Sequence, residues 1–333
     1  MEQIDNASDR IKRIRYRLLD ETPIISIERA KYYTEMWIET ENQNISLAER
    51  VALCMKHVLE NITIYIDNDD RIAGKWTENF IGIPIDIERG LWNRVFEIEL
   101  DAKTMKKYFN KNNRSYMSYM VDKVGADGLL EMLEMNKKMG ALITTLGTDS
   151  LEERKVNPYT IGNEDRTFLL TKLIPYWKNK TLADILEKEY ANSDVYTGEA
   201  YDFLSHLPLK TAQNDIVISP CAVIGVWQGH LVLDFKTVLE KGLITMLKEV
   251  KDEIESDEDI SDSQKEFLRS LEITYEAIII FARRLANRLK EDSDALEDGE
   301  RKKQLSIMHE NCVRVPMHPA TSFREAIQSF WII

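Results

Sequence analysis

The sequence has few of the residues that build disulfide frameworks, metal clusters and membrane spans. Its 333 residues include three cysteines and five histidines. The cysteines, Cys54, Cys221 and Cys312, lie far apart with no paired spacing, so neither a disulfide framework nor a zinc site is expected. No run approaches the roughly eighteen apolar residues of a membrane helix. The N-terminus lacks the basic start and apolar middle of a signal peptide, so the cytoplasm is the expected location.

Positive charge is also in deficit, since 44 Lys and Arg stand against 57 Asp and Glu and give a formal net charge of −13. Such a chain repels phosphate backbones, which argues against a nucleic-acid partner. The sequence contains no Gly-x-Gly-x-x-Gly after a strand, no Gly-Lys-Ser/Thr phosphate loop, no His-Glu-x-x-His and no Gly-x-Ser-x-Gly. Nucleotide binding, metal binding and serine nucleophiles therefore have no motif to support them.

Helical periodicity is the dominant pattern. Apolar residues recur every three or four positions over several segments, and a serine able to cap a helix precedes four of them. The four serines are Ser26, Ser46, Ser261 and Ser322. Further helices are expected over residues 235–254 and 301–314. The arginines between Arg10 and Arg17 are interpreted as a solvated helix face, and Cys54 as buried apolar filler.

Strand patterns are short and few. Residues 62–66 predict a strand or extended segment that leads into a turn at Asn68–Asp70. Residues 82–90 are interpreted as an irregular loop, because Pro84 and Gly90 interrupt their alternation. The best strand candidates are 216–219 and 222–227. One continuous unit is preferred, helical over 1–60, irregular and helical over 61–210, strand-rich over 215–234 and helical over 235–333.

The segment from Ser322 to Ile333 predicts a helix with one apolar face. Its members recur at helical spacing and are Phe323, Ile327, Phe330 and Trp331. No Gly, Asn or late basic residue closes this helix. We expect the chain to be the front part of a longer protein. The alternative is a non-catalytic helical interaction protein that docks a partner through Phe323–Ile333.

Candidate functional side chains gather near the predicted strands. His230 follows Gly229 at a strand end and precedes Asp234, a position where strand ends commonly carry functional groups. His206 and Asp202 lie in the segment before the strands. Each histidine also has a structural interpretation, as an imidazole bonded to a carboxylate or carbonyl. A hydrolase with paired carboxylates is a third hypothesis, which rests only on the abundance of acidic residues.

The order of several short segments resembles the front half of the glycyl radical enzymes, the superfamily of pyruvate formate-lyase and the glycerol and diol dehydratases. The last segment, Phe323-x-Glu-Ala-Ile-Gln-Ser-Phe-Trp331, carries most of the weight. Other matching segments include Asp9-Arg-Ile-Lys-Arg-Ile-Arg, Ala48-Glu-Arg-Val-Ala, Ile72-Ala-Gly, Ile174-Pro-Tyr-Trp, Gly229-His-Leu-Val-Leu-Asp-Phe and Val315-Pro-x-x-Pro-Ala.

This resemblance implies an α/β fold that is predominantly helical here, the N-terminal part of a ten-stranded α/β barrel that this chain leaves incomplete. It implies a lyase, a dehydratase or a formate acetyltransferase-like enzyme of anaerobic metabolism, which uses a glycyl radical and a thiyl cysteine. Neither the sequence motif of the radical glycine nor that of the thiyl cysteine occurs in this span. We therefore expect the span to be inactive alone. Asp202, His206 and His230 become the candidate residues lining the substrate pocket.

The resemblance also implies partners. A separate activating enzyme that uses S-adenosylmethionine would install the glycyl radical, and the missing C-terminal half would complete the enzyme. No directly bound cofactor or metal is expected in this span, a homodimer is a further hypothesis, and neither nucleic acid nor membrane is an expected partner. The substrate is a small molecule whose subclass depends mostly on residues of the second half.

Overall fold

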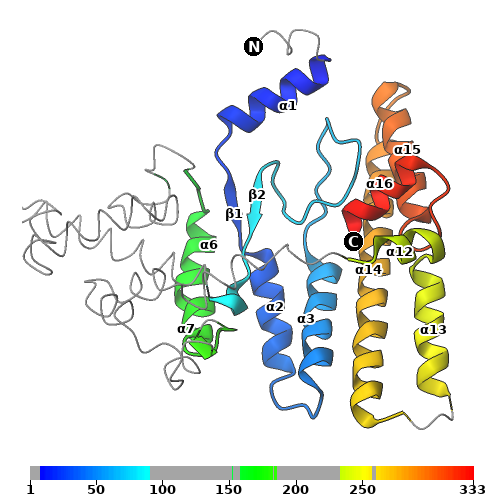
Figure 1. Ribbon diagram of the computed structural model, residues 1–333. Helices are drawn as coiled ribbons and strands as arrows, with labels where there is room; N and C mark the ends of the chain where they lie inside the picture. The colour runs from blue at the N-terminus through cyan, green and yellow to red at the C-terminus, as the bar shows by residue number, and fades with distance from the viewer. Residues whose placement is uncertain (1–7, 91–151, 153–157, 183, 186–232, 257–259) are drawn as a thin grey trace, which may run out of the picture. The chain divides into compact units, whose positions relative to one another are not determined.

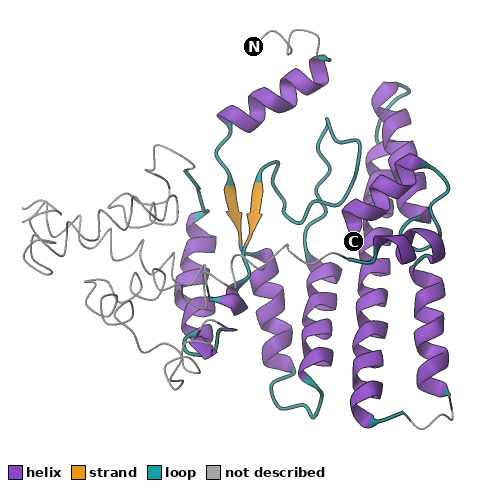
Figure 2. Ribbon diagram, viewed as in Figure 1, coloured by secondary structure: helices purple, strands orange, loops and turns teal. Residues whose placement is uncertain are grey.

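The computed structural model describes residues 8–90, 152, 158–182, 184–185, 233–256 and 260–333 (Figure 1). The chain divides into two compact units, Met1–Pro84 with Val232–Ile333, and Ile85–Leu231. Helices dominate the described parts of both units (Figure 2). The predicted subdivision of residues 1–333 stays a prediction, because much of 91–232 lies outside the described residues.

The first unit brings the two ends of the sequence together around a set of helices. Among its described residues the strands are β1 (Ile24–Ser26) and β2 (Gly82–Pro84). Its helices are α1 (Asp9–Asp20), α2 (Glu28–Glu39), α3 (Leu47–Asn61), α12 (Phe235–Lys241), α13 (Leu243–Glu255), α14 (Asp262–Asp294), α15 (Glu300–Arg314) and α16 (Phe323–Ile332).

Helix α14 is the centre of this unit. Ser261 begins it with a capping box, as the sequence predicts. The helix packs against α3, α13 and α15, so segments more than 200 residues apart share one core. Its fully buried apolar residues recur three and four positions apart, which is the spacing of one helix face, and are Ala282, Leu285 and Leu289.

Side chains close the C-terminal end of α3. The Arg284 guanidinium of α14 donates to the carbonyls of Leu59 and Ile62, at 2.6 and 2.7 Å, and so satisfies acceptors that a helix end leaves free. The next residue, Thr63, donates its N–H to Glu28 Oε2 at 2.8 Å. The Thr63 N–H is therefore bonded to a carboxylate and not to the backbone of a neighbouring strand. Of the two alternatives for residues 62–66, a strand or an extended segment, the strand is wrong.

Strands β1 and β2 form a parallel pair in which Ile24, Ile25 and Ser26 stand beside Gly82, Ile83 and Pro84. Two predictions are corrected here. Residues 82–84 are a strand rather than irregular loop, because the proline lies at the strand end and removes no bond needed from a central ladder. Ser26 belongs to β1 and donates to Glu78 Oε2 at 2.8 Å, so α2 begins without a serine cap.

Gly242 separates α12 from α13, where the sequence predicts one helical stretch. It has φ = 76°, and a Cβ there would lie 2.6 Å from the Met317 carbonyl oxygen. The first N–H groups of α13 then find acceptors outside the helix: Leu243 N donates to Pro316 O at 2.9 Å and Ile244 N to Met317 O at 3.0 Å. The segment after α15 thereby caps α13.

Helix α16 turns a polar side chain inward. Ser322 caps it by accepting from the Glu325 N–H, as predicted. The buried Gln328 amide accepts from Ala73 N at 3.0 Å and donates to Ala73 O at 2.7 Å, like a neighbouring peptide group. In contrast, Phe323, Phe330 and Trp331 of the predicted apolar face are 81%, 54% and 56% exposed.

In the second unit the described elements are short. They are the 3-10 turn η2 (Ile87–Arg89), α6 (Asn163–Phe168), the π-helical turn η4 (Leu169–Leu173) and α7 (Ile174–Trp177). Leu169, Leu173 and Trp177 are buried and lie four residues apart, so one continuous helical face forms the local core. The predicted strands 216–219 and 222–227 lie outside the described residues.

Candidate functional site

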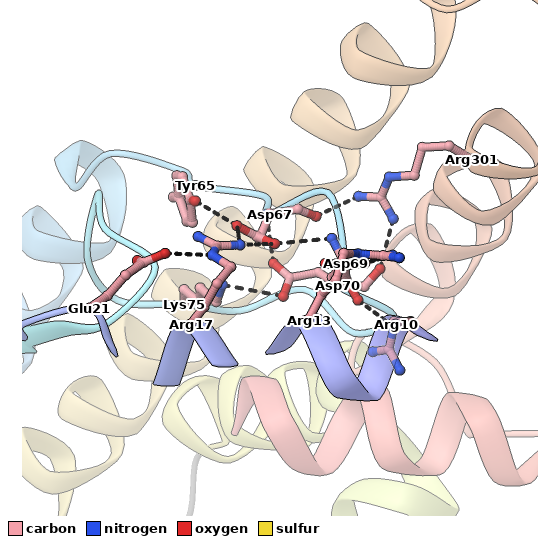
Figure 3. Close-up of polar contacts among 10 residues, drawn as sticks. All are labelled: Arg10, Arg13, Arg17, Glu21, Tyr65, Asp67, Asp69, Asp70, Lys75 and Arg301. Atoms are coloured by element: carbon pink, nitrogen blue, oxygen red, sulfur yellow. Dashed lines mark hydrogen bonds and ion pairs between the residues drawn. The ribbon is translucent and has the colours of Figure 1, made fainter. Parts of the chain in front are cut away.

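A dense polar cluster of the first unit surrounds residues 67–71, hereafter the Asp67–Arg71 loop (Figure 3). The loop fixes its own shape. Asp67 Oδ1 accepts from the Asp69 N–H at 3.0 Å, and Asp70 Oδ2 accepts from the Asp67 N–H at 2.7 Å. Aspartates favour such turns because their side chains bond nearby backbone N–H groups. The predicted turn at 68–70 is thus confirmed.

Helix α1 faces this loop with three arginines spaced three and four residues apart. Arg13 Nη2 lies 2.6 Å from Asp69 Oδ1, and Arg17 Nη1 lies 3.0 and 2.9 Å from the two oxygens of Asp67. Arg10 Nε donates to the Asp69 carbonyl at 2.7 Å. The interpretation of this charge run as a solvated face is therefore wrong for Arg10 and Arg17, which are partly buried against the loop. It holds for Arg13, which is exposed although it pairs with Asp69.

Other segments complete the cluster. Arg301 of α15 donates to the carbonyls of Asp70 and Asp67, at 2.8 and 2.7 Å. Lys75 Nζ lies 3.2 Å from Asp70 Oδ1. The Tyr65 hydroxyl donates to Asp67 Oδ2 at 2.8 Å. The loop is therefore held from α1, from α15 and from the chain that follows it.

The carboxylates differ in their electrostatics. The Arg13 hydrogen bond lowers the pKa of Asp69. Burial acts to raise the pKa of Asp67, but bonds from the Asp69 N–H, Arg17 and Tyr65 outweigh it, so the pKa is lowered. Burial raises the pKa of Asp70, and its contacts with the Asp67 N–H and Lys75 offset only part of that effect. Ionised, paired carboxylates of this kind anchor segments rather than attack a substrate.

Nucleophiles and metal ligands give no second site in the described part of the chain. Within the described residues, neither Cys54 nor Cys312 forms a disulfide bond, and both are fully buried, as predicted for Cys54. Burial raises the pKa of the Cys312 thiol to about 12. A thiol with such a pKa is not a nucleophile near neutral pH. The described residues include no group of three His, Cys, Asp or Glu that could hold a metal ion.

Among the helices of the described residues, none combines the length and the apolar character needed to cross a bilayer.

Asp202, His206 and His230, the site residues predicted from the sequence, lie outside the described residues. The Asp67–Arg71 cluster was missed. The spacing of Arg10, Arg13 and Arg17 could have indicated it, because it places three cations on one helix face opposite an aspartate-rich turn. Nothing in the sequence around Arg301 indicates that it contacts a loop more than 200 residues earlier.

Sequence similarity identifies the family. A family model described as pyruvate formate lyase-like matches residues 6–333. The chain therefore belongs to the pyruvate formate lyase-like family, within the glycyl radical enzyme superfamily that its sequence resembles. An isethionate sulfite-lyase of Oleidesulfovibrio alaskensis is 28% identical over 93% of this chain. A trans-4-hydroxy-L-proline dehydratase of Clostridioides difficile is 22% identical over 98% of it.

Solved structures show a similar fold. A structure concerned with 1,2-propanediol dehydration in Roseburia inulinivorans is 25% identical to this chain, covers 98% of it and has a TM-score of 0.64. The glycerol-bound, B12-independent glycerol dehydratase of Clostridium butyricum is 23% identical, with the same coverage and TM-score. The chain spans 30% of the isethionate sulfite-lyase, 33% of the trans-4-hydroxy-L-proline dehydratase, and 31% and 33% of the two solved chains.

Proposed function

We propose that this chain is the N-terminal portion of a glycyl radical lyase, which cleaves or eliminates across a C–C, C–O or C–N bond of a small organic substrate. The observation that carries the proposal is the family match over residues 6–333, to relatives named as a sulfite-lyase and dehydratases. The span covers about a third of those relatives. The remaining part would complete the ten-stranded barrel and supply the radical glycine and the thiyl cysteine.

Within such an enzyme this portion has a supporting role. Its ion-paired loop and its α14 core hold helices and the β1–β2 pair in place, and neither described cysteine has the exposure of a reactive thiol. Asp202, His206 and His230 remain our proposed pocket-lining residues. A radical S-adenosylmethionine activating enzyme is the proposed partner, and an oxygen-free compartment suits a protein radical that must be shielded.

The aromatic side chains of α16 support a contact with the rest of such an enzyme. Phe323 is 81% exposed, and Phe330, whose ring centroid lies 4.3 Å from that of Phe235, is still 54% exposed. Exposed aromatic groups of this size mark interaction surfaces. The alternative of an independent interaction protein explains the exposure equally, but it leaves the family match over nearly the whole chain without a reason.

Electron paramagnetic resonance tests the proposed function. The native gene is modified so that its protein product carries an affinity tag before Ser8. This product is purified without oxygen and treated with its activating enzyme and S-adenosylmethionine. We expect a polypeptide much longer than 333 residues with a doublet glycyl signal that oxygen destroys. The 333-residue chain treated in the same way is the control and should give no doublet. A tagged native product that gives no signal after activation would contradict the proposal.

A further inference from the structure

Four arginines belong to the Asp67–Arg71 loop or contact it, and three of them bind its backbone carbonyls. Arg10 of α1 donates to Asp69 O at 2.7 Å, and Arg301 of α15 donates to the Asp67 and Asp70 carbonyls. Arg324, in the first turn of α16, lies with Nη2 3.5 Å from Arg71 O. Arg71 itself is the fourth. All four arginines are half-buried.

Contacts with carbonyls hold these arginines in place without neutralising them. The carboxylates of the loop are engaged by other cations: Asp67 by Arg17, Asp69 by Arg13 and Asp70 by Lys75. The loop carboxylates also act on Arg301, and Asp69 acts on Arg10. The positive charge that remains unbalanced is therefore centred on Arg71, which is acted on by three arginines and by one carboxylate, that of Glu300.

Arg71 has the least favourable surroundings of the four. Burial lowers its pKa, and the charges of Arg10, Arg301 and Arg324 lower it further. Glu300 acts in the opposite direction, but it is exposed and its Oε1 already accepts from Gln304 at 2.8 Å. A half-buried cation surrounded by like charges is costly unless an anion joins it.

The same arginines have N–H donors to spare. Each guanidinium carries five, whereas Arg10 and Arg324 each give one to a carbonyl and Arg301 gives two. Arg301 Nε is buried without a partner among the described residues. The Arg71 side chain makes no hydrogen bond within the part of the chain that is described. Planar guanidinium forks with free donors are suited to anions that present two or three oxygens.

We propose that Arg71, together with Arg10, Arg301 and Arg324, binds a small oxyanion such as a phosphate, sulfate or carboxylate group. The anion neutralises the excess positive charge and ties α1, α15 and α16 to one loop. The site is built from the first and last parts of the sequence, so its occupation stabilises the first unit as a whole. It does not depend on the proposed radical chemistry.

Calorimetric titration of the 333-residue chain with inorganic phosphate, and separately with acetate at the same ionic strength, tests this site. We expect saturable binding of at least one of the two, and the tighter ligand shows whether a tetrahedral or a planar anion fits better. Arg71→Gln should weaken that binding about tenfold or more, because it removes a charged hydrogen-bond donor. Arg283→Gln is the matched control, since Arg283 is an exposed arginine of α14 outside the cluster, and it should bind as the parent does.

Thermal unfolding provides the second measurement. The ligand should raise the melting temperature of the parent and of Arg283→Gln, since a ligand that binds only the folded state stabilises it, and should raise that of Arg71→Gln less. Arg324→Gln replaces Arg71→Gln if the latter does not fold, and the same loss is expected. Failure of the parent to bind either anion, or equal binding by the cluster variant and the parent, would overturn the proposal.

Discussion

Helices α1 and α14 belong to the same unit but are held by opposite means. Helix α14 buries a row of apolar residues against three other helices. Helix α1 buries no residue, and its apolar Ile11, Leu18 and Leu19 are 46%, 56% and 69% exposed. Its attachment runs through the arginines that bind the Asp67–Arg71 loop.

The two kinds of attachment do different things: apolar burial stabilises the unit, and ion pairs fix the orientation of a helix. Apolar burial is non-directional and grows with the area removed from water, so α14 stabilises the unit strongly. Guanidinium–carboxylate pairs have fixed geometry but contribute little where water reaches them. Helix α1 is therefore precisely oriented and weakly held, and its attachment should respond to charge, pH and salt in ways that the α14 core does not.

The largest expected effect is on the α14 core. Leu285 is fully buried, so Leu285→Ala should lower the free energy of unfolding by about 2–5 kcal/mol through lost transfer energy and a cavity. The same truncation in α1, Leu18→Ala, should cost less than about 0.5 kcal/mol because Leu18 is exposed. Urea denaturation of both variants measures the two values. Similar losses at both positions would show that α1 is packed as α14 is.

Asp67→Asn should have the next largest effect and should act on α1. The substitution removes the negative charge of the carboxylate whose two oxygens both accept from Arg17. It also weakens the hydrogen bond that this side chain accepts from the Tyr65 hydroxyl. Asp67 is buried but the Arg17 side chain is 32% exposed, so we expect a loss of about 1–3 kcal/mol rather than that of a fully buried pair. Urea denaturation measures this loss.

Limited proteolysis with trypsin locates that loss. Cleavage within α1 of the Asp67→Asn variant should be faster, while cleavage within α14 is unchanged. Glu21→Gln is the control, because Glu21 also pairs with Arg17 but is 44% exposed. Protection of α1 that survives Asp67→Asn would assign its attachment to contacts other than this pair.

Acid should release α1 before it unfolds α14. The pKa values of Asp67 and Asp69 are lowered in the folded state. Their stabilising contribution is therefore present above the unfolded value of about 3.9 and is lost as pH falls through the folded pKa. The raised pKa of Asp70 acts in the opposite sense, since its protonation relieves the burial of charge.

Hydrogen exchange between about pH 3 and pH 6, corrected for the intrinsic exchange rate, measures this acid release. Protection of α1 should fall below about pH 4 while α14 keeps its protection. In the double variant Asp67→Asn with Asp69→Asn, α1 should be poorly protected at every pH. Simultaneous loss of protection in α1 and α14 at a single pH would count against separate attachment.

Sequence reasoning succeeded where the decisive contacts are local. Ser46, Ser261 and Ser322 cap helices because each meets an N–H only three residues ahead. It failed at Ser26, whose backbone pairs with a strand almost sixty residues later. The burial of Cys54 was predicted correctly because it follows from the apolar face of its own helix.

The same distinction applies to the candidate site. The partners of Arg13 and Arg17 lie 56 and 50 residues away, so a pattern within α1 could not name them. In α16, helical spacing grouped Phe323 and Trp331 on one face but could not show that the Gln328 amide would replace a peptide partner of Ala73. The family, by contrast, follows from the order of segments along the chain, which does not depend on contacts.

Salt should produce the smallest effect, confined to the exposed end of the α1 attachment. The Arg13–Asp69 pair is short at 2.6 Å, but the Arg13 side chain is 59% exposed, so mobile ions reach it. Raising NaCl from about 0.1 M to about 1 M shortens the screening length to about 3 Å and should increase tryptic cleavage of α1 slightly. Arg13→Gln should remove most of this salt response. In contrast, salt should not lower the stability of α14 against unfolding, since its core is apolar. If NaCl increases cleavage equally in the parent and in Arg13→Gln, then Arg13 does not carry the screened contact, and Arg17 or Arg10 must.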